Sequence, residues 1–445
     1  MNKPKLVLLG LGLVGHSLIK ILLESGLFLC DDIKVIDMSS EAFEYYNSFG
    51  GKKENFIQLK IERNNYHEIF STMKPGDFLI RLANGIDDKI LLDECMKRGI
   101  HYICSSNDIF LDTPENEPFL YRTHFYQYKE LIKKSKGCAT SIIQFGMNPG
   151  LISTLTKKAL IDIVENDDSE YVVKNRVQLK SFIDKRDFPG LARALQVTNI
   201  IEADWDATET DIKEDDDTVY NTWNLDDFYE EMYTRSIQKL GTLTSLKDHL
   251  KRFGILPEQI YYYNKNDGTL VLDVAGKNMM TEANIGDKII KGCIDAHEEI
   301  FSIHDYYTIR NDDGEIDYAP SVLFVYRPSD IALNSVYHKD IESYQMGKYK
   351  KEMITIDKMV SGTELVGVSV EGKNIHTFYV GVAPRFDKNS FETPTILAVS
   401  SAIYAAVAYI FNHSNDGILY PENLDVNEIL SYTKKFLPIV SMKIG

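Results

Sequence analysis

A glycine-rich motif near the start of the chain has the residue types and spacing of a phosphate-binding turn. It reads GLGLVG from Gly10 to Gly15 and follows an apolar run, Lys5 to Leu9, that predicts a buried strand. In such a turn Gly10 permits the sharp bend and Gly12 lets the backbone approach a pyrophosphate. Gly15 permits close packing of the next helix on the strand. The motif therefore predicts a dinucleotide site.

The residues that follow indicate which dinucleotide is bound. Backbone amides at Leu13 and Val14, at the positive end of the predicted helix, suit phosphate oxygens. A second apolar run, Ile33 to Ile36, ends in Asp37, 22 residues after Gly15. A carboxylate there accepts hydrogen bonds from ribose hydroxyls and repels a 2′-phosphate, so NAD is favoured over NADP.

A second turn motif, Asn148-Pro149-Gly150, comes directly after a predicted strand. Ligands of open α/β sheets bind at the carboxyl ends of parallel strands, so Asn148 and Pro149 are candidates for contact with the cofactor or substrate. A turn without chemistry explains the same residues equally well.

Trp223 is one of only two tryptophans, and Glu231 follows it within a run that also contains Asp226, Asp227 and Glu230. A tryptophan face with nearby carboxylates suits an ammonium group. The plainer alternative is a core tryptophan beside a solvated helix face.

His297 is followed by two glutamates, but the next histidine is seven residues away, so the HExxH spacing of a zinc site is absent and no metal is expected. A GxSxG motif is also absent, which leaves hydrolase chemistry without support.

The elements that must position these residues alternate between strands and helices up to Gly150. This pattern predicts an α/β Rossmann domain with a doubly wound parallel sheet over residues 1–150. The predicted elements are strands at 5–9, 33–36, 56–59, 77–82, 101–104 and 140–144, with helices at 66–73, 88–98 and 119–134.

The rest of the chain predicts a second, α+β substrate domain at residues 151–392, which is also expected to form the dimer contact. It begins with a helix at 151–164, and strands are expected at 172–182, 261–272, 321–326 and 377–382. The acidic stretch 202–217 is expected to be largely loop. Residues 393–445 are expected to be helical and to pack on the first domain, and the uncharged run 395–411 predicts a buried helix.

Composition limits the partners. The net charge of −17 disfavours nucleic acid and anionic membranes. Five cysteines with no CxxC pair indicate a reducing, cytoplasmic compartment.

Several sequence motifs follow one another along the chain in the order typical of one family. Through them the chain resembles bacterial homospermidine synthases, relatives of the saccharopine dehydrogenases. The motifs are GLGLVG from Gly10, YRTHFYQYKE from Tyr121, FGMNPGLIS from Phe145, NTWNLDDFYEE from Asn221, AHEEIFSIHDYYT from Ala296, PSVLFVYRPSD from Pro320, GTELVGV from Gly362 and DGILYPENLD from Asp416.

The resemblance implies a cytoplasmic homodimer that joins two putrescines into homospermidine with loss of ammonia. Bound NAD would oxidise one amine to an imine, a second diamine would condense with it, and the Schiff base would be reduced without net redox change.

The resemblance also implies roles for individual residues. Trp223 would contact a substrate ammonium, Glu231 would pair with an amine or move its proton, and Asn148 would lie beside the nicotinamide. His297 matches a family histidine, although Ala296 and Glu298 replace its neighbours.

The remaining acids depart from the family pattern. Asp204, or else Glu202, would supply one of the protein carboxylates that bind the substrate. Thr363 stands where the family has an acid, which leaves the position of the second carboxylate open, and the adjacent Glu364 is the candidate.

Two alternatives remain. A saccharopine- or carboxynorspermidine-type NAD(P)-dependent dehydrogenase would need a cation for a substrate carboxylate, with Arg327 and Arg122 as candidates. A catalytically altered NAD-binding protein would explain the changes around Thr363.

Overall fold

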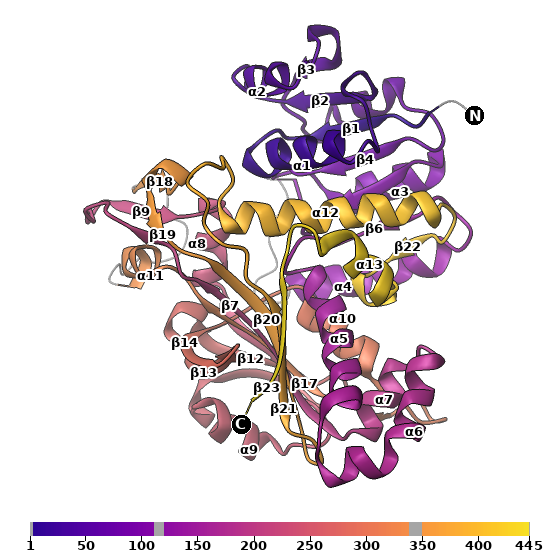
Figure 1. The fold of residues 1–445 in the computed structure, drawn as a ribbon, viewed down its shortest axis with the longest axis vertical. Coiled ribbons are helices and arrows are strands. Elements are labelled where there is room, and N and C mark those ends of the chain that lie inside the picture. Colours follow the sequence, from indigo (N-terminus) through magenta and orange to yellow (C-terminus); the bar gives the residue numbers. More distant parts are fainter. Residues whose placement is uncertain (1–2, 111–119, 338–348, 445) are drawn as a thin grey trace. The chain divides into compact units, whose positions relative to one another are not determined.

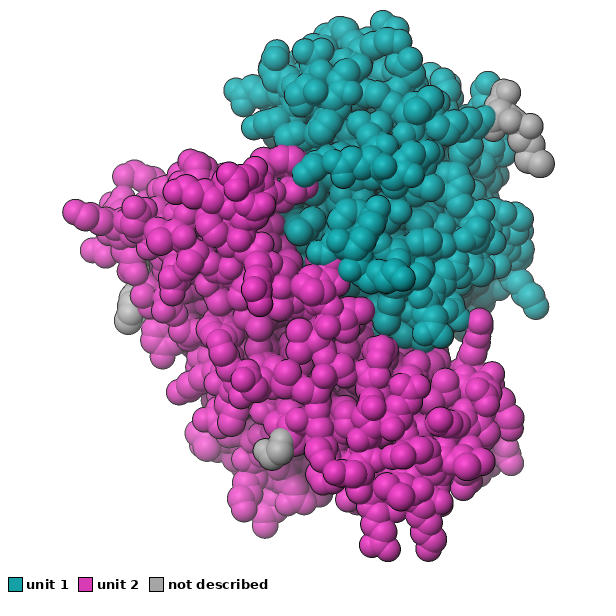
Figure 2. Space-filling model, in the orientation of Figure 1, with its two compact units in different colours: residues 1–154, 396–436 teal, residues 155–395, 437–445 magenta. Residues whose placement is uncertain are grey.

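A computed structural model gives the fold of residues 3–110, 120–337 and 349–444 (Figure 1). The chain forms two compact units, coloured separately in Figure 2. The first comprises residues 1–154 and 396–436, and the second comprises residues 155–395 and 437–445. Each unit has its own central sheet.

The sheet of the first unit has seven strands in the order β22-β6-β5-β4-β1-β2-β3, and every pairing is parallel. The strands are β1 (Leu6–Leu9), β2 (Ile33–Asp37), β3 (Phe56–Gln58), β4 (Phe78–Arg81), β5 (His101–Cys104), β6 (Ser141–Ile142) and β22 (Ile418–Leu419). The helices are α1 (Leu13–Glu24), α2 (Ala42–Ser48), α3 (Asp88–Arg98), α4 (Leu120–Lys134), α12 (Pro394–Asn412) and α13 (Val426–Thr433).

This arrangement confirms the predicted Rossmann sheet. Strand β1 lies between β2 and β4, so the strand order reverses at β1. Ligands of such sheets bind in the crevice at the carboxyl ends of the two strands where the order reverses. The loops that follow β1 and β4 therefore form the walls of the expected dinucleotide crevice.

The uncharged run near the end of the chain forms α12, as predicted. By length and composition this helix could cross a membrane, but 78% of its most apolar window is buried. Ser17 of α1 and Ser400 of α12 are both buried, and their hydroxyl oxygens lie 2.7 Å apart. Helix α12 is therefore a core helix of the first unit.

The second unit is built on a ten-stranded mixed sheet. Its main path is β11-β12-β10-β17-β7-β20-β21-β23, and β14 joins β13 to β17. The strands are β7 (Val197–Asp206), β10 (Arg235–Lys239), β11 (Ile260–Asn264), β12 (Thr269–Ala275), β13 (Met280–Ile285), β14 (Lys288–Asp295), β17 (Ser321–Arg327), β20 (Glu364–Gly372), β21 (Thr377–Val382) and β23 (Ile439–Ile444).

The helices of this part of the chain are α5 (Leu151–Asn166), α6 (Glu170–Asp184), α7 (Phe188–Ala194), α8 (Leu225–Tyr233), α9 (Leu246–Phe253), α10 (Glu299–Tyr307) and α11 (Asp330–Tyr337). Together with the mixed sheet they confirm an α+β architecture for the second unit.

The prediction of a strand at 172–182 is wrong, because these residues lie within helix α6. The buried residues Val172 and Leu179 are seven positions apart, which places them on one face of a helix. Val173 and Val177 are exposed, so the apolar run does not mark a buried strand.

The prediction that residues 202–217 are largely loop is also wrong at its start. Glu202, Asp204 and Asp206 belong to β7, the central strand of the sheet. They alternate with Ala203 and Trp205, as expected for a strand whose two faces differ. The number of acids hid this period-two pattern.

The final segment is only partly helical. Strand β22 joins the sheet of the first unit, and β23 pairs antiparallel with β21 of the second unit. The expectation of a wholly helical tail at 393–445 is therefore wrong. Residues 439–444 supply an edge strand, consistent with the β-branched and apolar pattern IVSMKI.

The two faces of the second sheet differ in chemistry. One face packs into an apolar core that includes Ile201, Ala203, Ile294, Leu323 and Val325, together with Leu250 and Phe253 of α9. The residues next to them on the same strands point to the opposite face. Those residues include several buried acids, and they define the candidate site described below.

Candidate functional site

The glycine turn of the first unit has the shape that a bound pyrophosphate requires. Gly10 has a φ of +88°, and a side chain there would lie 2.7 Å from the backbone nitrogen of Ala83. A side chain at Gly15 would lie 2.9 Å from the carbonyl oxygen of Gly10. By contrast, no described residue has an atom within 4 Å of the side-chain position of Gly12, so the turn is open where the backbone must approach a ligand.

Gly12 is also the N-cap residue of α1, and it makes no side-chain capping hydrogen bond to the helix. The first backbone N–H groups of α1, starting at Leu13 and Val14, are therefore at the helix end that favours anions. These features fit a dinucleotide phosphate.

Asp37 ends β2 and is held against the same turn. Its Oδ2 accepts a hydrogen bond from the Leu11 backbone N–H at 2.7 Å, and its Oδ1 accepts one from Ser39 at 2.7 Å. A carboxylate has about four lone-pair sites, so both oxygens can still accept ribose hydroxyls.

The turn at Asn148 lies beyond β6 in the first unit. Gly146 donates its backbone N–H to the Pro149 carbonyl at 2.7 Å, and Leu151 donates to the Gly146 carbonyl at 2.9 Å. Asn148 is half-buried within this closed turn. Asn148 thus follows the carboxyl end of β6, a parallel strand of the sheet.

The second unit carries what we call the acidic face: the buried carboxyl groups of one face of its sheet, together with two aromatic rings. Register on β7, β14, β17 and β20 places these side chains on one face. The acidic face comprises Glu202, Asp204, Asp206, Asp295, Glu364, Phe324 and Tyr326.

Three of these carboxyl groups form a group across two neighbouring strands. Glu364 of β20 lies directly opposite Asp206 of β7, and Asp204 follows on the same face. Burial raises the pKa of Glu364 well above its usual range, and Asp204 and Asp206 raise it further. Thr395 donates its hydroxyl to Glu364 Oε2 at 2.7 Å.

The pKa of Asp206 is also raised, mainly by burial, although hydrogen bonds from Thr208 and Thr222 oppose the shift. Thr222 donates its hydroxyl to Asp206 Oδ2 at 2.7 Å, which ties the NTW segment to β7. Thr363, by contrast, points its hydroxyl at the Pro384 carbonyl at 2.7 Å. Glu364 thus supplies the acid on this strand and Thr363 does not.

Trp223 is held by the acidic face. Its indole N–H donates to the Tyr326 hydroxyl oxygen at 3.1 Å. Burial raises the pKa of Tyr326 well above its usual value, and Asp206, Asp204 and Glu364 add to the shift. The tyrosine that accepts the indole N–H is therefore also under the electrostatic influence of all three carboxyl groups.

The NTWN segment leads directly into Glu231. Asn224 caps α8 by accepting hydrogen bonds from the backbone N–H groups of Asp226 and Asp227 at 2.9 and 3.3 Å. Glu231 lies near the end of that helix, with 16% of its side chain exposed. The exposed Asp226 pairs with Lys351, so the acids nearest in sequence to Trp223 are not all turned toward it.

His297 forms a second cluster with three acids. Its Nε2 lies 3.6 Å from Glu231 Oε1, and its Nδ1 is hydrogen-bonded to Glu299. Burial of the ring opposes a charge, yet Glu299 and Glu231 raise the pKa of His297 well above its usual value. Its ring lies 4.4 Å from the Phe324 ring, which places it over the acidic face.

Asp295 completes this second cluster. It is fully buried, and neither of its carboxyl oxygens has a hydrogen-bond partner among the described residues. Burial raises its pKa well above the usual range, and Glu231 adds to the shift while His297 opposes it. The pKa of Glu231 is likewise raised by burial, although His297 opposes that shift.

In the described part of the chain, no lysine or arginine forms an ion pair with Asp206, Asp295 or Glu364. A buried carboxylate without a cation is costly, so it either holds a proton or awaits a positive charge. This arrangement can bind a cationic ligand and exchange protons with it.

The structure thus groups the predicted site residues within each unit. Asp204 and Glu364 are adjacent, Glu231 and His297 are adjacent, and Trp223 is anchored beside the first pair. Asp206, Asp295 and Tyr326 are not among the predicted site residues. The period-two pattern in EADWD could have identified Asp206, whereas Asp295 and Tyr326 join the site only through strand pairing.

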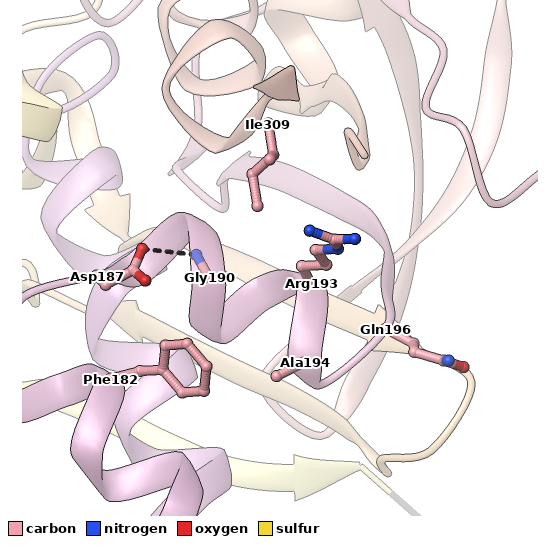
Figure 3. Close-up of a pocket in the computed structure, with 7 residues that line it drawn as sticks. All are labelled: Phe182, Asp187, Gly190, Arg193, Ala194, Gln196 and Ile309. Atoms are coloured by element: carbon pink, nitrogen blue, oxygen red, sulfur yellow. Dashed lines mark hydrogen bonds between the residues drawn. The ribbon is translucent and has the colours of Figure 1, made fainter. Parts of the chain in front are cut away.

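A separate surface pocket of about 650 Å³ lies at α6 and α7 (Figure 3). Its two charged side chains already have partners, because Asp187 accepts the Gly190 N–H at 2.9 Å and Arg193 pairs with Asp317 at 2.7 Å. Phe182, Ala194 and Ile309 supply apolar lining. This pocket therefore does not contain the group of buried carboxyl groups that defines the acidic face.

One group of described residues has the spacing of a cation site. Ligand atoms of Asp167, Asp168 and His376 lie within 4.8 Å of one another. Lys443 Nζ already lies 2.8 Å from Asp168 Oδ1, so this group has a cation of its own.

Comparison with known proteins gives relatives over nearly the whole chain. Residues 6–139 match the saccharopine dehydrogenase NADP binding domain family. Homospermidine synthase of Blastochloris viridis is 23% identical over 457 residues, covering 98% of this chain and 90% of that protein. Homospermidine synthase of Mesorhizobium japonicum is 22% identical, covering 86% of this chain and 79% of that protein.

Solved structures agree with these matches. Homospermidine synthase of Legionella pneumophila in complex with NAD has a TM-score of 0.82 at 21% identity, covering 99% of this chain and 91% of that one. Apo saccharopine dehydrogenase of Saccharomyces cerevisiae has a TM-score of 0.55 at 11% identity, covering 99% and 100%. The predicted fold and the resemblance to homospermidine synthases are therefore confirmed.

Proposed function

We propose that this chain is a homospermidine synthase that joins two putrescines into homospermidine and releases one ammonia, with NAD as a hydride carrier. The observation that carries this proposal is the acidic face, where Asp206, Asp295 and Glu364 are buried without a lysine or arginine partner among the residues that the structure describes. The chain is 23% identical to a homospermidine synthase, and the match covers 98% of its length. This relative supports the same substrate class.

The residues of the glycine turn fit NAD. The open side of Gly12 and the N–H groups of Leu13 and Val14 would hold the pyrophosphate, and Asp37 would hold the ribose hydroxyls. We assign Asn148 and Pro149 to the same cofactor site. When bound, NAD supplies a hydride acceptor for an amine carbon and then a hydride donor for a Schiff base.

The acidic face supplies the charge that a diamine needs. Putrescine carries two ammonium groups at neutral pH, and each is best bound by carboxylates and an aromatic face. Asp204, Asp206 and Glu364 would bind one ammonium group beside the Trp223 ring. The hydrogen bond from Trp223 to Tyr326 would hold that ring in place.

The second cluster has the groups needed for proton transfer. An amine must lose a proton before a hydride leaves its carbon, and the departing nitrogen must gain protons before it leaves as ammonia. Glu231 would exchange these protons with the substrate, because its raised pKa brings it closer to neutral pH. His297, 3.6 Å away and oriented by Glu299, would hold or return the proton.

A substrate with a carboxylate fits the structure less well. Arg327, the candidate cation on the acidic-face strand β17, already pairs with Asp330 at 2.5 Å. The neighbouring buried groups are acids, which would repel a substrate carboxylate. These observations favour a diamine over the substrate of a saccharopine-type dehydrogenase.

The homodimer and the cytoplasmic location stay predictions, and so does the expectation that the chain acts without nucleic acid or membrane.

Product analysis tests the proposed reaction. Purified protein with putrescine and NAD should form homospermidine and ammonia in equal amounts, with no accumulation of NADH, as measured by mass spectrometry and absorbance. Trp223→Ala should lower the rate at least tenfold while retaining NAD binding. Stoichiometric NADH would indicate a net dehydrogenase instead. NAD binding with no product from putrescine would contradict the proposed reaction and favour a catalytically altered protein.

A further inference from the structure

A buried arginine ends strand β4 at the carboxyl edge of the Rossmann sheet. Arg81 is 1% exposed, and its guanidinium group donates to three residues, Asp88, Ala83 and Ser106. Its Nε and Nη2 donate to the two carboxyl oxygens of Asp88 at 2.6 and 2.8 Å. Its Nη1 donates to the Ala83 carbonyl at 3.0 Å, and Nη2 also donates to the Ser106 carbonyl at 2.5 Å.

Asp88 connects the same arginine to a third segment. It lies at the start of α3 and is fully buried. The Asp108 backbone N–H donates to Asp88 Oδ2 at 2.5 Å, and the Tyr102 hydroxyl also hydrogen-bonds to Asp88. The ion pair therefore ties together the loop after β4, the loop after β5 and the start of α3.

The loop after β4 is one wall of the crevice at which the strand order reverses. Ala83 and Leu82 both donate to the Leu9 carbonyl, at 3.0 and 2.8 Å. The side-chain position of Gly10 lies only 2.7 Å from the Ala83 nitrogen, so the two loops are in direct contact. The placement of Ala83 therefore determines the space available at the glycine turn.

We propose that the Arg81–Asp88 ion pair is a positioning device for the dinucleotide, which holds the β4 wall of the crevice against the glycine turn. Arg81 acts through Ala83 and does not itself bind the pyrophosphate. Its charge is balanced by the bidentate pair with Asp88, and its donors are engaged by Asp88 and the carbonyls of Ala83 and Ser106.

This role differs from that of a phosphate-binding arginine in a measurable way. An arginine that neutralises phosphate contributes an attraction that weakens with salt. A positioning arginine changes the shape of the crevice, so the ratio of NAD dissociation constants between variant and wild type should not depend on salt. The proposal rests on the proposed function only in requiring that the chain binds NAD.

The test is NAD binding by full-length protein, measured by calorimetry at 50 and 300 mM salt. Arg81→Lys keeps the charge but cannot form the bidentate pair or reach both carbonyls. We expect its Kd for NAD to rise at least tenfold, by the same factor at both salt concentrations. The matched control is Arg98→Lys, because Arg98 is an exposed residue of α3 that pairs with Glu94. Its Kd should stay within twofold of wild type.

A second variant covers the case in which Arg81→Lys does not fold. Tyr102→Phe removes one hydrogen bond to Asp88 and keeps the ring, and we expect a two- to fivefold rise in Kd. A purely structural role would lower Tm and leave Kd unchanged at a temperature well below unfolding, and that result would overturn the proposal. Wild type that binds NAD but makes no homospermidine would overturn the proposed function and leave this inference standing.

Discussion

Buried carboxyl groups occur in both units, but Asp88 of the first unit has an arginine partner, whereas Asp206, Asp295 and Glu364 of the acidic face have no lysine or arginine partner among the described residues. In the first unit Asp88 is fully buried, and its two carboxyl oxygens accept from Nε and Nη2 of Arg81. In the second unit Asp206, Asp295 and Glu364 are also buried, and within the described ranges no lysine or arginine pairs with them. The first arrangement is complete in the folded chain, whereas under the proposed function a cationic ligand would complete the second.

The contrast shows why buried charge alone does not identify a binding site. The Arg81–Asp88 pair holds loops in place, and its ionic groups are not available to a substrate. The acidic face keeps its carboxyl groups in an unfavourable state, which a dication would relieve. These buried carboxyl groups would thus lower the stability of the ligand-free protein and increase its affinity for a cation.

The largest expected effect comes from removing the arginine of the complete pair. Arg81→Met leaves Asp88 buried without its partner, and the free energy of unfolding should fall by about 3–5 kcal/mol. Urea denaturation measures this change. Arg98→Met, which breaks only an exposed pair with Glu94, should cost less than about 1 kcal/mol. Equal losses in the two variants would mean that the buried pair has no special importance.

The opposite behaviour is expected on the acidic face. Glu364→Gln should raise the KM for putrescine by about tenfold to a hundredfold, corresponding to the loss of one charge-assisted contact. The free energy of unfolding should be unchanged or higher, because a buried carboxyl group is removed. Steady-state kinetics and urea denaturation give the two values.

The matched control for that variant is Glu371→Gln on the same strand, β20. Glu371 pairs with Arg252 at 2.9 Å and is not part of the acidic face. Its replacement should leave the KM within twofold of wild type. A similar KM for both variants would argue against diamine binding at Glu364.

Asp295→Asn should stabilise the ligand-free protein by about 1–2 kcal/mol at pH 8. The pKa of Asp295 is raised in the folded state, so the native protein binds this proton more tightly than the unfolded chain does. Wild type therefore loses stability as pH rises from the unfolded pKa toward the folded pKa. The gain from the variant should be smaller at pH 5, as thermal unfolding at the two pH values would show. Destabilisation at pH 8 would contradict the cost assigned to this group.

The smallest expected effect is a pH dependence of substrate affinity. The pKa values of Asp206 and Glu364 are raised, so these groups must lose protons to bind an ammonium group. The KM for putrescine should therefore fall severalfold from pH 6 to pH 8, while putrescine stays dicationic. A KM that is constant or rises over this range would mean that the carboxyl groups do not pair with the substrate.

The two regions also differ in how far the sequence predicts them. The glycine turn and Asp37 are predictable because strand, turn, helix and strand follow one another within one short βαβ unit. The acidic face depends on pairings between strands far apart in the chain, such as Asp206 with Glu364 and Asp295 with Phe324. The order of the motifs predicts Trp223, Glu231 and His297 as site residues. Tyr326 can be assigned to the acidic face only from the strand register.

Misleading composition explains the remaining errors. An acidic segment resembles a solvated loop unless its alternation is recognised, and β7 is such a case. In α6, valines on an exposed face imitate a strand. The buried pair of Arg81 and Asp88 could not be inferred from composition, because most arginine and aspartate residues lie at the surface.

The most direct test of the proposed reaction follows the hydride. Putrescine carrying deuterium on both carbon atoms beside its nitrogens would be incubated with the protein, catalytic NAD and a pool of unlabelled NADH. If the hydride is taken from and returned to the same substrate chain, homospermidine should retain all eight deuterium atoms, and the NADH pool should stay unlabelled. Homospermidine with seven deuterium atoms, or putrescine consumed with stoichiometric labelled NADH, would contradict the proposal.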